Sequence, residues 1–268
     1  MLIWVCALHC EAKPVIDYYR LKKSHDDNAF DLYLGDDMAC VISGIGKVAS
    51  AAACAWVAAR QAQQPSLAWI NLGVAGAAEH STGSLFSVTQ VIDADTGQRF
   101  YPAPIGGSKI AGSACETVSA PSDDYREDRL FDMEASGFMY SCLRFSSAEL
   151  VQSLKVISDN RHEKTGNNRP QVSLLIQQQI SAIDAQAQTL LQLNEELAAL
   201  VPASDEWQRL TAMARFTQTQ KNRLRVLWRY LLNRNFDAEQ LLQQHAGQTA
   251  DGIIESLQQL SYRDSENL

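Results

Sequence analysis

The stretch FDLYLGDDMACVISGIGKVASAAA, residues 30–53, indicates the class of fold. Two apolar runs flank the turn-forming sequence GDD, which predicts a β-hairpin over residues 30–43. A glycine-rich turn follows, and the alanine-rich segment after it predicts a helix over residues 47–63. A strand that leads directly into a helix is the repeating unit of α/β proteins.

The same alternation continues on both sides of this stretch. Buried-strand runs and helically spaced apolar residues follow one another through about residue 160. The further strands are predicted over residues 2–8, 67–73, 83–95 and 153–159, and the further helices over residues 11–20 and 133–145. We therefore expect an α/β fold with a central mixed, largely parallel sheet flanked by helices.

The last hundred residues have a different pattern. Apolar residues recur on one face of a helix predicted over residues 171–201, and further helical segments follow without a strand signal. We expect an α/β domain over residues 1–164 and an all-helical C-terminal extension over residues 165–268. The helix 171–201 is expected to pack on the α/β domain.

Composition restricts the classes of function. The net charge of −8 argues against general nucleic-acid binding, and no apolar run is long enough to cross a membrane. The six cysteines form no CxxC pair, which favours reduced, buried thiols over metal ligands or disulfides. The N-terminus has no basic leader. We expect a cytoplasmic protein without a membrane span, a bound metal or a cofactor.

A helix predicted over residues 207–236 carries seven basic residues and no acidic one, with aromatic residues interleaved. Such a helix can bind nucleic acid or an acidic partner. We favour the alternative, a solvated basic face whose aromatic side docks on the domain or on a second subunit.

Chemically informative residues follow several of the predicted strands. In doubly wound sheets, ligands bind at the C-terminal ends of the strands. These positions carry Glu11, GIGK (44–47), GVAG (73–76) and Ser158-Asp159, and Met133-Glu134 begins the next helix. Each alone has an ordinary explanation as a cap or a turn, and GIGK lacks the spacing of a Walker phosphate loop.

Together, five motifs resemble the purine/uridine phosphorylase superfamily, and most of all its 5′-methylthioadenosine/S-adenosylhomocysteine nucleosidases. The motifs are ALHCEAKPVI (7–16), SGIGKVASAAA (43–53), INLGVAGAA (70–78), DMEASGFMYS (132–141) and KVISD (155–159). They occur in the family's order and cover about residues 1–160. The resemblance carries no information about the C-terminal extension.

The resemblance implies a division of roles for cleaving an N-glycosidic bond. Asp159 is the acid that donates a proton toward purine N7, and Glu11 is the base that activates water. Glu134 accepts hydrogen bonds from the ribose hydroxyls, for which a carboxylate offers several lone pairs. Met133 packs against the face of the sugar.

The resemblance also implies further contacts with substrate. The segment ETVSA (116–120) occupies the base-binding strand without an aromatic residue, which leaves Phe100 or Tyr101 to stack on the base. The remaining implied contacts are Ser158, Gly73, Val74, Thr117 and Val118.

Three residues favour the hydrolytic branch over the phosphorylases. Glu11 is a poor neighbour for a phosphate dianion, and Asn71 and Val74 stand where the phosphate-binding loop has an arginine and a hydroxyl. The sequence departs from the nucleosidases as well. Val74 lacks a hydroxyl that they keep, and Lys155 replaces their usual arginine.

We therefore predict an enzyme, an N-ribosyl hydrolase that acts on a purine nucleoside or a 5′-modified nucleoside. The alternative is a purine nucleoside phosphorylase. A second alternative is a catalytically degenerate nucleoside-binding module whose helical tail binds a partner or nucleic acid. The expected partner is a small-molecule nucleoside, and the resemblance implies a homo-oligomer, a dimer or larger.

Overall fold

The computed structural model describes residues 1–25, 29–61, 64, 66–106, 108–121, 129–163, 168–199 and 204–265. The last residues of the helices predicted over 47–63 and 171–201 lie outside this part of the chain. Contacts divide the chain into two compact units, Met1–Asn194 and Glu195–Leu268.

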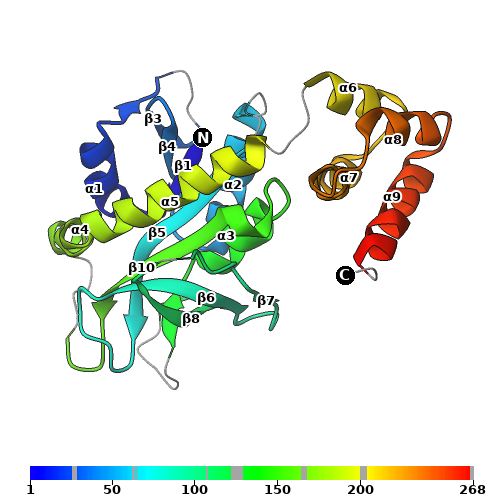
Figure 1. Cartoon of the computed structure of the whole chain (residues 1–268). Helices are drawn as coiled ribbons and strands as arrows, with labels where there is room; N and C mark the ends of the chain where they lie inside the picture. The colour runs from blue at the N-terminus through cyan, green and yellow to red at the C-terminus, as the bar shows by residue number, and fades with distance from the viewer. Residues whose placement is uncertain are drawn as a thin grey trace. The chain divides into compact units, whose positions relative to one another are not determined.

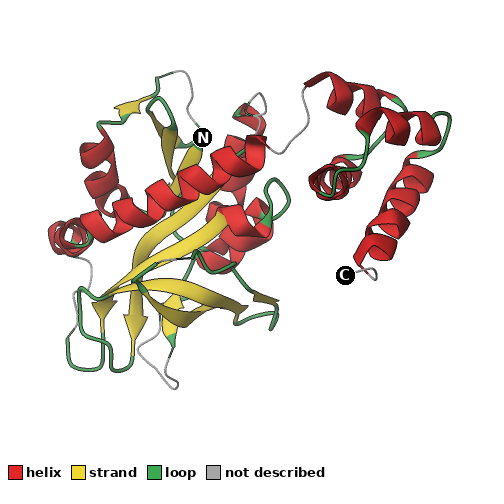
Figure 2. Ribbon diagram, viewed as in Figure 1, coloured by secondary structure: helices red, strands yellow, loops and turns green. Residues whose placement is uncertain are grey.

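The first unit consists of one sheet with helices on both of its faces (Figure 2). Its strands are β1 (Leu2–Cys6), β2 (Lys22–Lys23), β3 (Asp31–Leu34), β4 (Met38–Ile42), β5 (Ala68–Ala77), β6 (Leu85–Asp93), β7 (Arg99–Phe100), β8 (Ala111–Thr117), β9 (Leu130–Asp132) and β10 (Val151–Asp159). Its helices are α1 (His9–Tyr19), α2 (Lys47–Arg60), α3 (Ala135–Cys142), the short η1 (Ala148–Leu150), α4 (Arg169–Gln178) and most of α5 (Ile180–Ala199).

The order of the strands confirms the predicted mixed sheet. β1 lies between β4 and β5 and is parallel to both, and β5 is in turn parallel to β10. β3 and β4 form the antiparallel hairpin predicted around the GDD turn. From β10 the pairing continues to β6, then to β8 and then to β9, and β9 also pairs with β5. Five strands therefore close into a ring, with β5 shared between the ring and the open part of the sheet.

The helices cover the two faces in separate groups (Figure 1). α1 and α4 pack on each other and on the central strands, whereas α2 and α3 pack on each other on the opposite side. Strands buried on both faces are mainly apolar, as in the fully buried β1 and in its neighbour β5, where Asn71 is the one polar side chain. Trp4 and Trp69 are the largest side chains in this core, and both are fully buried.

The prediction of one continuous helix over residues 171–201 is wrong. The helix is interrupted at Gln179, which separates α4 from α5. Its packing on the α/β unit is seen in α5. Asp184 accepts hydrogen bonds from the hydroxyls of Tyr18 at 3.0 Å and Tyr19 at 2.6 Å, both from the end of α1.

The second unit is entirely helical within its described residues. Its helices are α6 (Ser204–Ala212), α7 (Gln218–Asn233), α8 (Ala238–His245) and α9 (Ala250–Ser265). The continuous helix predicted over residues 207–236 is wrong, since Thr217 caps a new helix at that point by accepting from the Gln220 backbone N–H at 3.2 Å. Trp228 is fully buried among leucines and isoleucines of the unit's own core, so the aromatic side of α7 docks within the unit.

All six cysteines are free thiols, and five of them are buried. Among the described helices, none is long and apolar enough to cross a membrane.

The contact between α2 and α3 depends on the absence of a side chain at Gly137. A Cβ atom there would lie 1.9 Å from the carbonyl oxygen of Lys47. Replacing glycine by alanine inside a helix ordinarily stabilises a protein by about 0.5–1 kcal/mol. Here we expect Gly137→Ala to lower the free energy of unfolding by about 2 kcal/mol or more, because α3 must move away from α2.

Urea denaturation measures this effect. Gly106→Ala is the matched control, because no atom lies within 4 Å of the Cβ that it adds. A Gly137→Ala protein as stable as the wild type would show that the two helices do not pack as closely as described.

Candidate active site

Glu11 joins the first turn of α1 to the middle of β5. Its Oε2 accepts from the Leu8 backbone N–H at 2.9 Å, and its Oε1 accepts from the Val74 backbone N–H at 3.0 Å. The side chain is buried, and burial raises its pKa despite the two N–H donors and the nearby Lys155 ammonium. The carboxylate is therefore fixed in place, and each oxygen keeps a lone pair for another donor.

Gly73 is the residue that lets this carboxylate approach β5. A Cβ atom at this position would lie 2.9 Å from Glu11 Oε1 and 3.6 Å from Lys155 Nζ. Lys155 pairs with Gly73 across the parallel β5–β10 ladder. A side chain at residue 73 would thus separate the carboxylate from the ammonium, so the glycine is needed for their approach.

Lys155 is buried in the middle of β10 and forms an ion pair with Asp132 at 2.7 Å. Burial by itself lowers the pKa of a lysine, but Asp132 and Glu134 outweigh burial and raise the pKa of Lys155 above its usual value. The lysine is therefore charged, and its charge is partly neutralised by the carboxylates around it.

Asp132 also caps α3. Its Oδ2 accepts from the backbone N–H groups of Ala135 at 2.8 Å and Glu134 at 3.3 Å, while its Oδ1 accepts from the Thr117 hydroxyl at 2.7 Å. Because Asp132 satisfies the first N–H groups of the helix, Glu134 does not have to do so.

The carboxylate of Glu134 instead points toward the glycine-rich turn before α2. Its Oε1 accepts from the Gly46 backbone N–H at 2.8 Å. Burial raises the pKa of Glu134, with smaller contributions from Asp132 and Glu11, and Lys155 and the Gly46 N–H oppose this effect; the resulting pKa is about 7. A buried carboxylate with so few donors has capacity for additional hydrogen-bond donors such as hydroxyl groups.

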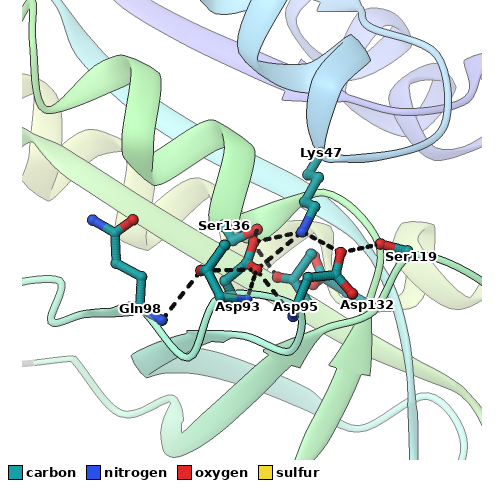
Figure 3. Close-up of polar contacts among 9 residues, drawn as sticks. Lys47, Asp93, Asp95, Gln98, Ser119, Asp132 and Ser136 are labelled. Atoms are coloured by element: carbon teal, nitrogen blue, oxygen red, sulfur yellow. Dashed lines mark hydrogen bonds and ion pairs between the residues drawn. The ribbon is translucent and has the colours of Figure 1, made fainter.

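The glycine-rich turn is held by an ion-pair network at the end of β6 (Figure 3). Lys47 Nζ contacts Asp93 Oδ2 at 2.8 Å and Asp95 Oδ2 at 2.6 Å, and the hydroxyl of Ser136 on α3 donates to Asp93 at 2.7 Å. Burial alone would raise the pKa of Asp93, but these donors hold it well below its usual range. Lys47, the lysine of GIGK, is therefore paired with two carboxylates. This agrees with the prediction that GIGK is a structural turn and not a phosphate-binding loop.

Asp159 ends β10, where the pairing with β5 shifts register between Ile157 and Asp159. Such a bulge changes the direction in which a side chain points. The hydroxyl of Ser158 donates to Asp159 Oδ2. Gly76 of β5 pairs with Asp159 on one side and with Phe131 on the other, so Asp159 and the segment that carries Asp132 and Glu134 flank the same residue.

The other predicted substrate contacts lie at different depths. Thr117 is fully buried, and its hydroxyl accepts from the Ser136 N–H at 3.0 Å as well as donating to Asp132. Val118 and Met133 are half-buried; Met133 follows Asp132 in the chain, and the N–H of Val118 donates to the Asp132 carbonyl at 2.8 Å. These residues adjoin the carboxylates.

The two candidate stacking aromatics are linked to β6. Phe100 pairs with Val91 across the β6–β7 ladder and packs against the hydrophobic core. Tyr101 is exposed, and its hydroxyl accepts from Gln90 at 3.0 Å. Their role in stacking on a base stays a prediction.

Sequence reasoning missed the partners that position the predicted residues. In the sequence, Asp132 is part of the motif DMEASGFMYS and Asp93 lies within the strand predicted over residues 83–95, and neither pattern predicts an ion pair. A signal for the first was present, because a lysine in the apolar run LKVIS needs a buried carboxylate partner.

The first unit therefore combines an α/β fold with a cluster of buried carboxylates around one lysine. No protein-family profile and no curated protein sequence matches the chain. Solved structures of nucleosidases do match it in fold, which confirms the resemblance seen in the motifs.

One such structure is the apo 5′-methylthioadenosine nucleosidase of Arabidopsis thaliana, at a TM-score of 0.57 and 15% identity, covering 72% of this chain and 94% of that one. Another is the 5′-methylthioadenosine/S-adenosylhomocysteine nucleosidase of Neisseria meningitidis in complex with methylthio-immucillin-A, at 0.54 and 18%, covering 68% and 97%. The Helicobacter pylori nucleosidase with butyl-thio-DADMe-Immucillin-A matches at 0.55 and 12%, covering 70% and 97%. At these identities the likeness concerns the fold.

The raised pKa of Glu134 predicts a specific pH dependence of stability. The folded protein holds this proton up to about pH 7, whereas the unfolded chain releases it near 4.5. The stabilisation from the protonated carboxyl is complete below the unfolded pKa and is lost as the pH rises through the folded one. Glu134→Gln lacks this titrating group. As the pH rises from about 5 to about 8, we therefore expect the unfolding free energy of wild type to fall by about 2–3 kcal/mol relative to that of Glu134→Gln.

Urea unfolding of both proteins at the two pH values gives this difference. Glu149→Gln, at an exposed position, is the control and should show no such change. A difference between Glu134→Gln and wild type that is the same at both pH values would contradict the assignment.

Proposed function

We propose that the protein is an N-ribosyl hydrolase that cleaves the N-glycosidic bond of a purine nucleoside or a 5′-modified nucleoside. Water adds to C1′ of the ribose, and the bond from C1′ to the base nitrogen breaks. One proton passes from water to a carboxylate, and another passes from an acid to the departing base. The transition state is an oxocarbenium-like cation, which a site with excess negative charge stabilises.

The position of Glu11 is the observation that carries this proposal. Its two oxygens are held by the backbone N–H groups of Leu8 and Val74, so that the carboxylate is fixed and each oxygen can still accept a hydrogen bond from water. Burial raises its pKa, which makes it a stronger base than an exposed glutamate. A fixed, basic carboxylate is suited to remove a proton from water.

The charge balance around Lys155 supports hydrolysis over phosphorolysis. One buried ammonium is surrounded by the carboxylates of Asp132, Glu134 and Glu11. When all of these groups are ionised, the sum is negative. Such a cluster attracts a developing sugar cation and repels a phosphate dianion. We therefore favour a hydrolase over a phosphorylase.

Asp159 and Glu134 have the remaining roles in this proposal. Asp159 delivers the proton to the base, from a strand end at which the pairing with β5 shifts register. Because Asp132 caps α3, the carboxylate of Glu134 is available, and it accepts hydrogen bonds from the ribose hydroxyls. The oligomeric state stays a prediction.

The Glu11→Gln variant tests the nucleophile. Glutamine keeps the size and an accepting oxygen but lacks the basic carboxylate, so nucleoside binding should persist while hydrolysis falls by about 10²-fold or more. The measurement is single-turnover release of base, with binding followed by calorimetry. Ribose 1-phosphate as the main product in phosphate buffer, from a fully active Glu11→Gln enzyme, would assign the protein to the phosphorylases.

The Asp159→Asn variant tests the acid. Asparagine cannot donate the required proton, so the chemical step should slow by about 10²-fold or more while the melting temperature stays near that of wild type. A panel of purine nucleosides with and without phosphate provides the assay. Ligand binding without turnover by the wild-type protein would instead support the nucleoside-binding module.

A further inference from the structure

A cavity of about 520 Å³ lies between the first turns of α1 and α4. The two helices pack side by side (Figure 1). α1 and the residue before it contribute Leu8, His9 and Cys10 to the lining, and α4 contributes Arg169 and Ser173. The volume lies within the range of cavities that hold small-molecule ligands.

The charged side chains of this cavity are basic, in a chain whose net charge is −8. Lys13 and Arg169 supply the positive charge, and no carboxylate belongs to the described lining. Lys13 Nζ contacts Asp17 Oδ2 at 2.6 Å, with more than half of each side chain exposed. Exposed pairs of this type contribute little to stability, so an anionic ligand can replace Asp17.

Arg169 has no ion-pair partner within the described chain, and it lies in the first helical turn of α4. A guanidinium offers several N–H donors in a plane that matches two oxygens of a phosphate or carboxylate. The hydroxyl of Ser173 lies one turn further along the same helix and is half-buried in the lining. The lining therefore combines positive charge with hydrogen-bond donors.

The cavity borders the proposed site of hydrolysis. Leu8 lines the cavity, and its backbone N–H donates to Glu11 Oε2 at 2.9 Å. In the proposed function, the base faces Asp159 and the ribose diol faces Glu134. The part of the nucleoside without an assigned binding region is the substituent on C5′, and this cavity adjoins the carboxylate that activates water.

We propose that the cavity binds an anionic 5′ substituent, and that the preferred substrate is a purine nucleoside 5′-phosphate. This inference rests on the proposed nucleosidase function and specifies its substrate class. Water then converts the nucleotide to free base and ribose 5-phosphate. The C1′–N bond breaks, the phosphate ester is unchanged, and no further reactant is needed.

The test compares base release from adenosine 5′-monophosphate, adenosine and 5′-methylthioadenosine. We expect kcat/KM of wild type for the monophosphate to exceed that for adenosine by at least about tenfold, which corresponds to about 1.4 kcal/mol. Arg169→Ala and Lys13→Ala should each reduce that ratio, mainly through KM, and the double variant should abolish the preference. Lys22→Ala, which removes an exposed lysine of β2, is the matched control and should keep the ratio.

A second measurement separates this inference from the proposed function. Glu11→Gln protein should bind adenosine 5′-monophosphate at least about tenfold more tightly than adenosine, and the added substitution Arg169→Ala should remove the difference. If no compound is hydrolysed but this preference is found, the function fails and the anion site stands. Equal binding of the two compounds, or an unchanged ratio in the Arg169→Ala enzyme, would refute the anion site.

Inorganic phosphate distinguishes the two possible sources of the anion. It should only compete with the monophosphate for the cavity. If it instead accelerates base release from adenosine and yields ribose 1-phosphate, the cavity binds the nucleophile, and the inference is wrong.

Discussion

The buried ion pair of Lys155 and Asp132 is the constraint on which the rest of the site depends. An ammonium removed from water costs several kcal/mol unless a carboxylate faces it, and loss of one partner of such a pair typically costs about 3–5 kcal/mol. Asp132 also caps α3 and accepts from Thr117, so its position fixes the start of that helix. The lysine thereby determines the position of Glu134, although Lys155 lies in the middle of β10 and Glu134 lies between β9 and α3.

β5 is the second organising element. Within Gly73–Ala77 it contacts Glu11, faces Lys155 and pairs with both Asp159 and Phe131. Because backbone groups of one strand hold most of these partners, the geometry depends little on the flexibility of side chains. The same arrangement gathers several carboxylates around one ammonium. Burial there raises the pKa values of Glu11 and Glu134, and for Glu134 the neighbouring Asp132 and Glu11 add to the effect.

Much of the fold followed from local patterns in the sequence. The hairpin around GDD, the turn into α2 and the strand that ends at Asp159 are all determined by neighbouring residues. The break between α4 and α5 could not be predicted in this way, because apolar residues continue on one face through Gln179. The ring closure through β9 also depends on contacts between distant residues, and β9 has only the three residues Leu130–Asp132 to signal it.

The same limit applies to the candidate site. Glu11, Glu134 and Asp159 could be predicted from the sequence, because each stands next to a recognisable strand or helix end. The supporting residues Asp93 and Asp132 could not be predicted in this way, since their importance arises from lysines that lie far away in the sequence.

The closed ring of strands has a consequence for the behaviour of the protein at high concentration. Unpaired strand edges are templates for association between molecules. Among the described strands, the ends of the pairing order fall on β2 and β7, each only two residues long. β2 consists of two exposed lysines, Lys22 and Lys23, whose charge opposes the addition of another strand. The topology that builds the carboxylate cluster therefore also protects the sheet against edge-to-edge aggregation.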